Sequence, residues 1–230
     1  MSQTHTIEGL VSGFVRQLTS RPDAVRSELD RLGGIRRRTL ALVRDLDEAQ
    51  AAFAPRSKAW SIAQNLDHIV LFEGLYRDAI SKLIDLGKQR KPTKIVYTLK
   101  DIDVSISGLP NVVLSAMEIP MNLMNQFIPS FVRQTIVRFP VLAANSPKIA
   151  EPRAGLTLAS LREQLTESAR VTRDLLTPPL PAPASKMVIS HPVLGINDIV
   201  DLLGMMCAHE ERHQDQMRNI LADSRLPKAA

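Results

Sequence analysis

Cysteine is almost absent from this sequence, because Cys207 is the only one in 230 residues. A single cysteine excludes an intramolecular disulfide. Residues 1–8 are polar and lack the basic and then apolar layout of a secretory signal. These two absences favour a cytoplasmic location. Cys207 also stands two residues before His209 and projects from a different side of any helix, which predicts a small buried residue and not a metal ligand.

Aromatic side chains are scarce as well, at 4% of the sequence, although apolar residues make up 44%. The core must then be built mainly from Leu, Ile, Val, Ala and Met, a mixture that suits helices better than sheets. A chain of this length can form one substantial core. We therefore predict a single domain over residues 1–230.

Long hydrophobic runs are also missing. The most apolar stretch, residues 119–132, is flanked by Glu118 and Arg133 and is shorter than the roughly 18 residues that span a bilayer. The net charge of +5 comes from basic residues mixed with acidic ones, and we interpret the arginine run at residues 36–38 as a solvated helix face. Because the longest apolar stretch is too short, we expect no membrane span. Because there is no nucleic-acid motif and there are few aromatics for base stacking, we also expect no nucleic-acid partner.

Four segments carry apolar residues at three- and four-residue spacing, which is typical of amphipathic helices. Ser61 and Gln64 have the spacing of a capping box, Thr157 can cap a third helix, and Asn197 can cap a fourth. We expect helices at about residues 22–47, 61–86, 157–177 and 197–222. The sequence thus predicts an all-α fold, a four-helix bundle.

The segment between the second and third helices, about residues 87–155, contains seven prolines that interrupt every long helix. We interpret it as an irregular, partly helical insertion whose apolar residues pack against the bundle or against a partner subunit. A second proline-rich stretch, residues 178–195, is expected to be a loop.

Two histidines interrupt the apolar face of the last predicted helix. His209 and His213 are four residues apart, so both rings lie on one side and can share an ion. Such a pair also arises by chance, and the string around it matches the H-E-x-x-H pattern of metalloproteases, although the extended histidine tail is missing. Residues next to a ligand point about 100° away around a helix, so we expect Glu210 and Glu211 to face solvent.

His68 lies on the apolar side of the second helix, where a bundle can bring it opposite the pair. Three histidines would leave a coordination position open for water or substrate, as catalytic sites do. The alternative is three ordinary buried histidines, each bonded to its own partner. Gln216 faces the same way as His213, so it either contacts a metal-bound water or substrate or simply packs.

Two strings resemble the DinB-like family. One is Lys58-Ala59-Trp60-Ser61-Ile62 followed by Asn65-Leu66-Asp67-His68, and the other is His191-Pro192-Val193-Leu194-Gly195 followed by His209, Arg212, His213 and Gln216. The resemblance implies a DinB-like bundle in which His68, His209 and His213 bind a divalent transition metal, namely zinc, nickel or iron. It also implies a homodimer, and it places Trp60, which the residues alone predict to be a core anchor, near the site.

The chemistry of the family is varied, since its architecture is similar to that of thiol-dependent S-transferases and isomerases and of metal-dependent hydrolases. Our hypothesis is a metal-dependent enzyme, a hydrolase or a thiol-dependent S-transferase, whose open metal position activates water or a thiol. Its substrate would be a small molecule, joined in the transferase case by a low-molecular-weight thiol. Two alternatives stay open: a non-catalytic metal-binding module, and an interaction protein whose insertion forms a dimer interface.

Overall fold

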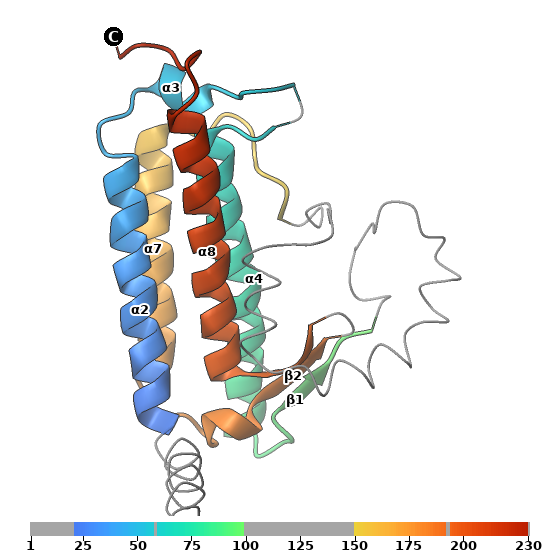
Figure 1. Ribbon diagram of the computed structural model, residues 1–230. Helices are drawn as coiled ribbons and strands as arrows, with labels where there is room; N and C mark the ends of the chain where they lie inside the picture. Colours follow the sequence, from blue (N-terminus) through green and yellow to red (C-terminus); the bar gives the residue numbers. More distant parts are fainter. Residues whose placement is uncertain (1–20, 58, 99–149, 192–193, 230) are drawn as a thin grey trace, which may run out of the picture.

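A computed structural model of the chain describes residues 21–57, 59–98, 150–191 and 194–229. Four long helices lie side by side (Figure 1), and they are α2 (Arg21–Leu42), α4 (Ile62–Lys88), α7 (Leu158–Leu176) and α8 (Ile199–Leu221). Helices α7 and α8 each pack against both α2 and α4. The predicted all-α bundle is confirmed.

Two of the predicted helix starts are set by the side chains that the sequence indicated. The N–H of Ser61 donates to Gln64 Oε1 at 2.9 Å, and the N–H of Gln64 donates to Ser61 Oγ at 3.2 Å. Thr157 Oγ1 accepts from the N–H of Ser160 at 3.2 Å. Because these caps satisfy backbone donors that have no partner within the helix, α4 and α7 begin directly after them.

The first predicted helix is divided in two. Helix α2 ends at Leu42, and a short helix α3 (Glu48–Ala52) begins after Asp47, whose carboxylate accepts from the N–H of Gln50 at 2.8 Å. The segment between α2 and α3 is bonded to α7, because the guanidinium of Arg162 in α7 donates to the carbonyl of Arg44 at 2.7 Å and to two neighbouring carbonyls. A single helix over residues 22–47 was therefore wrong at its C-terminal end.

A small sheet, which the sequence did not indicate, lies beside the end of the bundle where α8 begins (Figure 1). Its strands are β1 (Lys94–Val96), β2 (Val188–His191) and β3 (Gly195–Asp198), with β2 in the middle, parallel to β1 and antiparallel to β3. Residues 178–195 are thus not all loop. Strand β1 belongs to the predicted insertion, of which residues 99–149, with most of its apolar side chains, lie outside the described residues.

Asn197 does not cap α8, contrary to the prediction. It lies in β3, and its side-chain amide donates to the carbonyls of Leu194 and Gly195, at 3.0 Å in each case. The cap is Asp198, whose carboxylate accepts from the N–H of Asp201 at 3.0 Å. The strand leads directly into the helix, so its last residue also serves as the cap.

The interior of the bundle contains two hydrophobic clusters with a polar band between them. The cluster nearer the sheet includes Ile35, Leu83 and Leu203. The other includes Leu66 and Leu161. The polar band consists of buried side chains from all four long helices, namely Arg36, Thr39, His68, Glu73, Thr172, His209, Glu210 and His213. The histidines predicted to form a site therefore lie within this band.

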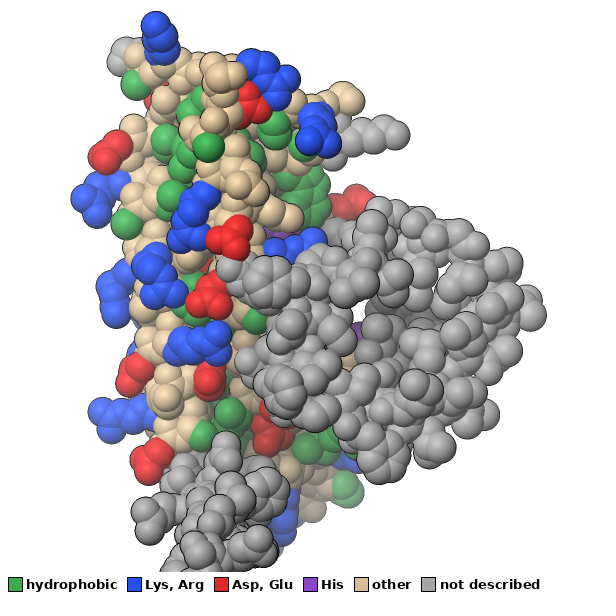
Figure 2. Space-filling view, in the orientation of Figure 1, with side chains coloured by type: hydrophobic (Ala, Val, Ile, Leu, Met, Phe, Trp, Pro, Cys, Tyr) green, Lys and Arg blue, Asp and Glu red, His purple; other side chains and the backbone are tan. Residues whose placement is uncertain are grey.

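The arginine run at residues 36–38 is not uniformly solvated as predicted. Arg36 is 3% exposed, whereas Arg37 and Arg38 are exposed. Successive residues turn by about 100° on a helix, so one of the three faces the interior. Figure 2 shows basic and acidic side chains interspersed on one face of the bundle, as the mixed sequence predicted. Within the described ranges, no helix combines the length and apolarity needed to cross a bilayer.

Candidate metal centre

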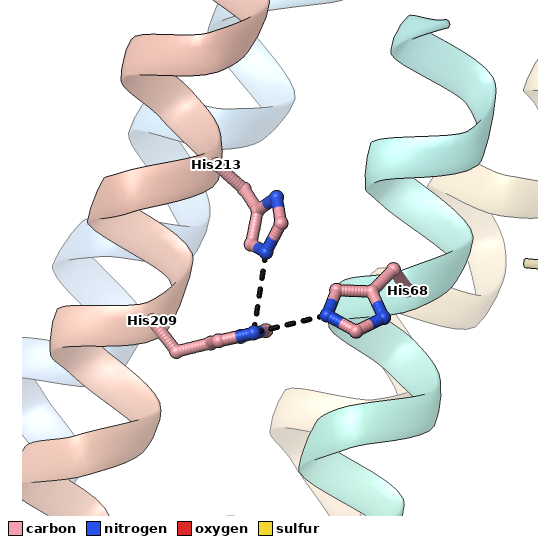
Figure 3. A group of neighbouring side chains, drawn as sticks. All are labelled: His68, His209 and His213. Atoms are coloured by element: carbon pink, nitrogen blue, oxygen red, sulfur yellow. Dashed lines mark hydrogen bonds between the residues drawn. The ribbon is translucent and has the colours of Figure 1, made fainter. Parts of the chain in front are cut away.

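Three histidines from two facing helices meet at one point. His68 comes from α4, and His209 and His213 come one turn apart from α8 (Figure 3). His209 Nε2 lies 3.1 Å from His68 Nε2 and 3.2 Å from His213 Nε2. All three side chains are buried, at 5%, 6% and 2% exposure for His68, His209 and His213. One nitrogen of each ring therefore points into a shared, enclosed space.

A backbone carbonyl sets the tautomer of His68. Its Nδ1 lies 2.6 Å from the carbonyl oxygen of Ala150, and a carbonyl can only accept a hydrogen bond. Nδ1 must then carry the proton in the neutral ring. Nε2 of His68 is left with a lone pair that faces the other two histidines.

An asparagine does the same for His213. The Nδ1 of His213 lies 2.7 Å from Asn65 Oδ1, and Asn65 Nδ2 donates to the carbonyl of Ser61 at 2.8 Å. The second bond fixes which end of the amide is the oxygen, so His213 Nδ1 is the donor. Nε2 of His213 therefore also presents a lone pair to the shared space.

His209 stands between these two lone pairs and cannot satisfy both. Its Nε2 carries at most one proton, which can be donated to His68 or to His213 but not to both. A cation held by all three Nε2 atoms satisfies the whole set, and the Nε2 atoms are the nitrogens through which imidazoles bind transition metals. The ligand atoms lie within 4.8 Å of one another, so the three side chains could hold one metal ion.

Protonation of the histidines does not resolve the conflict. Burial lowers the pKa of all three rings, and for His209 and His213 it does so far below the usual value. The positive charge of Arg212 lowers the same three pKa values further. The rings are neutral near pH 7, which is the form that ligates a metal.

Aromatic rings line the histidine cluster. Phe72 stacks on His209 with ring centroids 3.6 Å apart and an interplanar angle of 11°. Trp60, only half-buried, lies 4.6 Å from the ring of His68 and is stacked near His213 at 6.0 Å. Trp60 thus contacts the cluster directly, and these apolar walls strengthen electrostatic interactions inside it.

A clamp next to His68 positions the carbonyl that sets its tautomer. Asp67 is buried and accepts from the backbone N–H of Arg153 at 2.6 Å and from its guanidinium at 2.6 Å. The clamp ties the segment that begins at Ala150 to α4. The partner of His68 Nδ1 is therefore held by a second contact, as is common around metal-binding histidines.

The two glutamates after His209 differ from the prediction. Glu210 is 1% exposed and accepts from Arg36 Nε at 2.9 Å and from Thr39 Oγ1 at 2.6 Å, so its expected exposure was wrong. It points toward α2 and away from the histidines. Glu211 is partly exposed and pairs with arginines of α2. Neither glutamate is placed to act as a general base at the cluster.

Three other side chains singled out in the sequence also have defined surroundings. Cys207 is fully buried, as predicted, and burial raises the pKa of its thiol. His191 accepts from the N–H of Leu194 at 3.1 Å and so stabilises the turn after β2, and burial lowers its pKa to about 4. Gln216 lies beside His213 and raises the pKa of His213 through a side-chain hydrogen bond.

Several functional neighbours escaped the sequence analysis. Asn65 lies one turn before His68 on α4, and that spacing was a usable signal for a second contact to the site. Nothing in the sequence pattern indicated the bonds of Arg36 to Glu73 and Glu210, because these bonds depend on which helices face each other. Asn65 and Arg212 were noted only as parts of the two family-like strings.

Comparison with known proteins identifies the family. The sequence model of the DinB superfamily matches residues 31–217, a range that includes all three histidines. No curated protein and no solved structure matches the chain. Because the family match covers well over half of the 230 residues, this chain belongs to the DinB superfamily.

Proposed function

We propose that this protein is a metal-dependent enzyme that binds a divalent transition ion, such as zinc, nickel or iron, through His68, His209 and His213. The observation that carries the proposal is the pair of fixed tautomers. Ala150 and Asn65 force two lone pairs toward His209 in a space where its single proton cannot serve both. A structural role for the three rings would need no such convergence.

The donor set favours a catalytic site over a closed structural one. Structural zinc sites have four protein ligands, whereas catalytic sites commonly have three and leave a position for substrate. Among the described residues, no further His, Cys, Asp or Glu joins the three histidines. A fourth protein ligand would favour the alternative of a non-catalytic metal-binding module.

The chain's own residues divide the work at such a site. A bound ion supplies Lewis-acid chemistry, which lowers the pKa of a group coordinated to it. Asn65 and Ala150 keep two of the ligating nitrogens deprotonated, and Phe72 and Trp60 limit water around the rings. The reaction classes that fit are hydrolysis of a small molecule and transfer involving a low-molecular-weight thiol.

Homodimer formation is part of the same proposal, and sedimentation velocity tests it.

Metal content tests the proposal directly. Untagged wild type, His209→Ala and His191→Ala are loaded with zinc or nickel, desalted and analysed by inductively coupled plasma mass spectrometry. We expect about one ion per chain in wild type. The His209→Ala variant should lose the ion, and His191→Ala should keep it because His191 bonds to a turn. Wild type that binds no metal, or His209→Ala that binds it as tightly, would contradict the proposal.

A further inference from the structure

A short irregular segment contacts the metal centre on the side of His68. Residues 151–157 belong to no helix or strand and pass beside α4 before α7 begins (Figure 1). Ala150, directly before them, is fully buried, and its carbonyl oxygen lies 2.6 Å from His68 Nδ1. Glu151 and Arg153 are exposed. The chain therefore passes from a buried histidine to the protein surface within a few residues.

One arginine bonds this segment to the bundle. Among the described residues, the hydrogen bonds that join residues 151–155 to the rest of the chain all come from Arg153, which donates to Asp67 and to Gln164. Gly155, at a φ of 78°, connects the segment to the start of α7 in a conformation that glycine adopts readily. Segments with few buried apolar contacts open locally at low cost, so the contact between Arg153 and Asp67 decides how often this one opens.

The outer contacts of the other two histidines are built into helices. His213 is bonded to Asn65, which lies in α4 and donates to a carbonyl at the start of that helix. His209 is stacked on Phe72, also in α4. Breaking either contact requires α4 and α8 to separate, and both helices contribute to both hydrophobic clusters. His68 is thus the histidine whose contact with Ala150 can be released without moving a helix.

We propose that the clamp between Asp67 and Arg153 controls metal exchange, and that His68 is the ligand that leaves first. This inference rests on the proposed metal-binding function and concerns the regulation of the same site. While the clamp is closed, the carbonyl of Ala150 keeps the proton of His68 on Nδ1 and the ring in place. When the clamp opens, the segment moves away from α4, and His68 is free to turn out of the cluster. Two histidines bind a transition ion more weakly than three.

The clamp combines strength with access to water. The backbone N–H, Nε and Nη2 of Arg153 all donate to the buried carboxylate of Asp67, and such charge-assisted bonds are stronger than neutral ones. The side chain of Arg153 is 49% exposed, so water hydrates the guanidinium as soon as it is released. The buried pair of Arg36 and Glu210 would instead leave two charges without solvent. The exposed clamp can therefore open and close reversibly while the bundle stays intact.

The kinetics of metal exchange test the assignment. Trp60, the only tryptophan of the chain, contacts His68, so its fluorescence reports the binding of cobalt(II). Stopped-flow mixing of metal-free protein with cobalt gives the association rate constant, and mixing of cobalt-loaded protein with excess chelator gives the dissociation rate constant. We expect Arg153→Ala to raise both by about tenfold, the effect of losing one charge-assisted contact. The Kd, which is their ratio, should change less than either.

A second variant separates opening of the clamp from a direct effect of charge on the cation. Arg153→Ala removes a positive charge and Asp67→Asn removes a negative one, so direct electrostatic effects on the two rate constants would have opposite signs. Opening of the clamp predicts that both variants exchange cobalt faster. The double variant should exchange no faster than the quicker single variant, because both changes break the same contact.

Two further variants complete the set. Arg170→Ala removes an exposed arginine of α7 that pairs with Glu167, and its rates should equal those of wild type. Arg153→Lys keeps the charge without the planar fork, so its rates should lie between those of wild type and Arg153→Ala. The two Arg153 variants carry the test should Asp67→Asn fail to fold.

The outcomes separate this inference from the proposed function. Wild type that takes up no cobalt contradicts the metal centre itself. Wild type and Arg153→Ala that exchange cobalt at equal rates overturn the role of the clamp and leave the metal centre standing. Faster dissociation with unchanged association in Arg153→Ala also overturns it, because the clamp would then only strengthen the bound state.

Discussion

At a metal centre made of histidines, the hydrogen-bond partner of each outer nitrogen decides whether the inner nitrogen carries a lone pair or a proton. In this protein the partner of His213 is Asn65, whose orientation is fixed by the carbonyl of Ser61. The partner of His68 is a backbone oxygen, which no side-chain substitution removes. Asn65 is therefore the residue at which the tautomer of His213 can be altered without replacing one of the three proposed ligands.

We predict that Asn65→Leu lowers metal affinity by about 10- to 100-fold, the usual cost of losing such a partner. Without the acceptor, His213 can move its proton to Nε2, and the lone pair then points away from the site. Asn65→Asp keeps an acceptor for His213 Nδ1, so its metal affinity should be at least as high as that of Asn65→Leu. Chelator competition measures the affinities, with Asn219→Leu on the exposed side of α8 as the control. An unchanged affinity in Asn65→Leu would rule out tautomer control.

At the scale of single elements, α8 carries buried polar side chains on two of its faces. One carries His209 and His213 toward α4, and the other carries Glu210 and Gln214 toward α2. Burial lowers the pKa of Arg36, but the charges of Glu210 and Glu73 and their hydrogen bonds more than offset this and raise it above its usual value, so Arg36 stays charged. The ionic group ties α2, α4 and α8 at the level of the histidines.

Neighbouring glutamates of α8 should therefore respond very differently to substitution. Glu210→Ala leaves Arg36 buried with one carboxylate fewer, and we expect a loss of about 3 to 5 kcal/mol in the free energy of unfolding. Glu211→Ala removes a partly exposed pair and should cost about 1 kcal/mol or less. Urea denaturation of the two variants measures both values. Equal losses would mean that the burial of Glu210 contributes nothing specific.

The elements that could be predicted are those with local signals. Ser61 and Thr157 act through hydrogen bonds to residues three positions away, so α4 and α7 were readable from the sequence. The strands are three or four residues long, too short for an alternating pattern, and the cap of α8 was misassigned by one residue.

The candidate site divides in the same way. His68, His209 and His213 were found because each lies on an apolar helix face and the last two are one turn apart. The burial of Glu210 and of Arg36 depends on which helix lies opposite, and one sequence does not contain that information. Packing decides their roles.

At the scale of the whole molecule, the polar band makes the stability of the metal-free protein depend on pH. Burial holds the pKa of His68, His209 and His213 below the value of 6.5 expected for an unfolded chain. Between the folded and unfolded values the unfolded chain binds more protons, so acid favours unfolding. The metal-free protein should therefore lose stability as the pH falls below about 6.5, before most carboxylates titrate.

We predict that metal-free wild type loses about 1.4 kcal/mol per strongly shifted histidine for each pH unit below 6.5. Replacing one of them, as in His213→Leu, should reduce the slope by that amount, because one fewer ring must be kept neutral. The free energy of unfolding is measured in urea at several pH values between about 7.5 and 5.5 after removal of metal with a chelator, a window in which histidine is the main titrating side chain. The exposed substitution Asn219→Leu provides a control with the wild-type slope. Equal slopes for wild type and His213→Leu would mean that His213 is not held neutral by burial, and the lone pair assigned to its Nε2 would lose its basis.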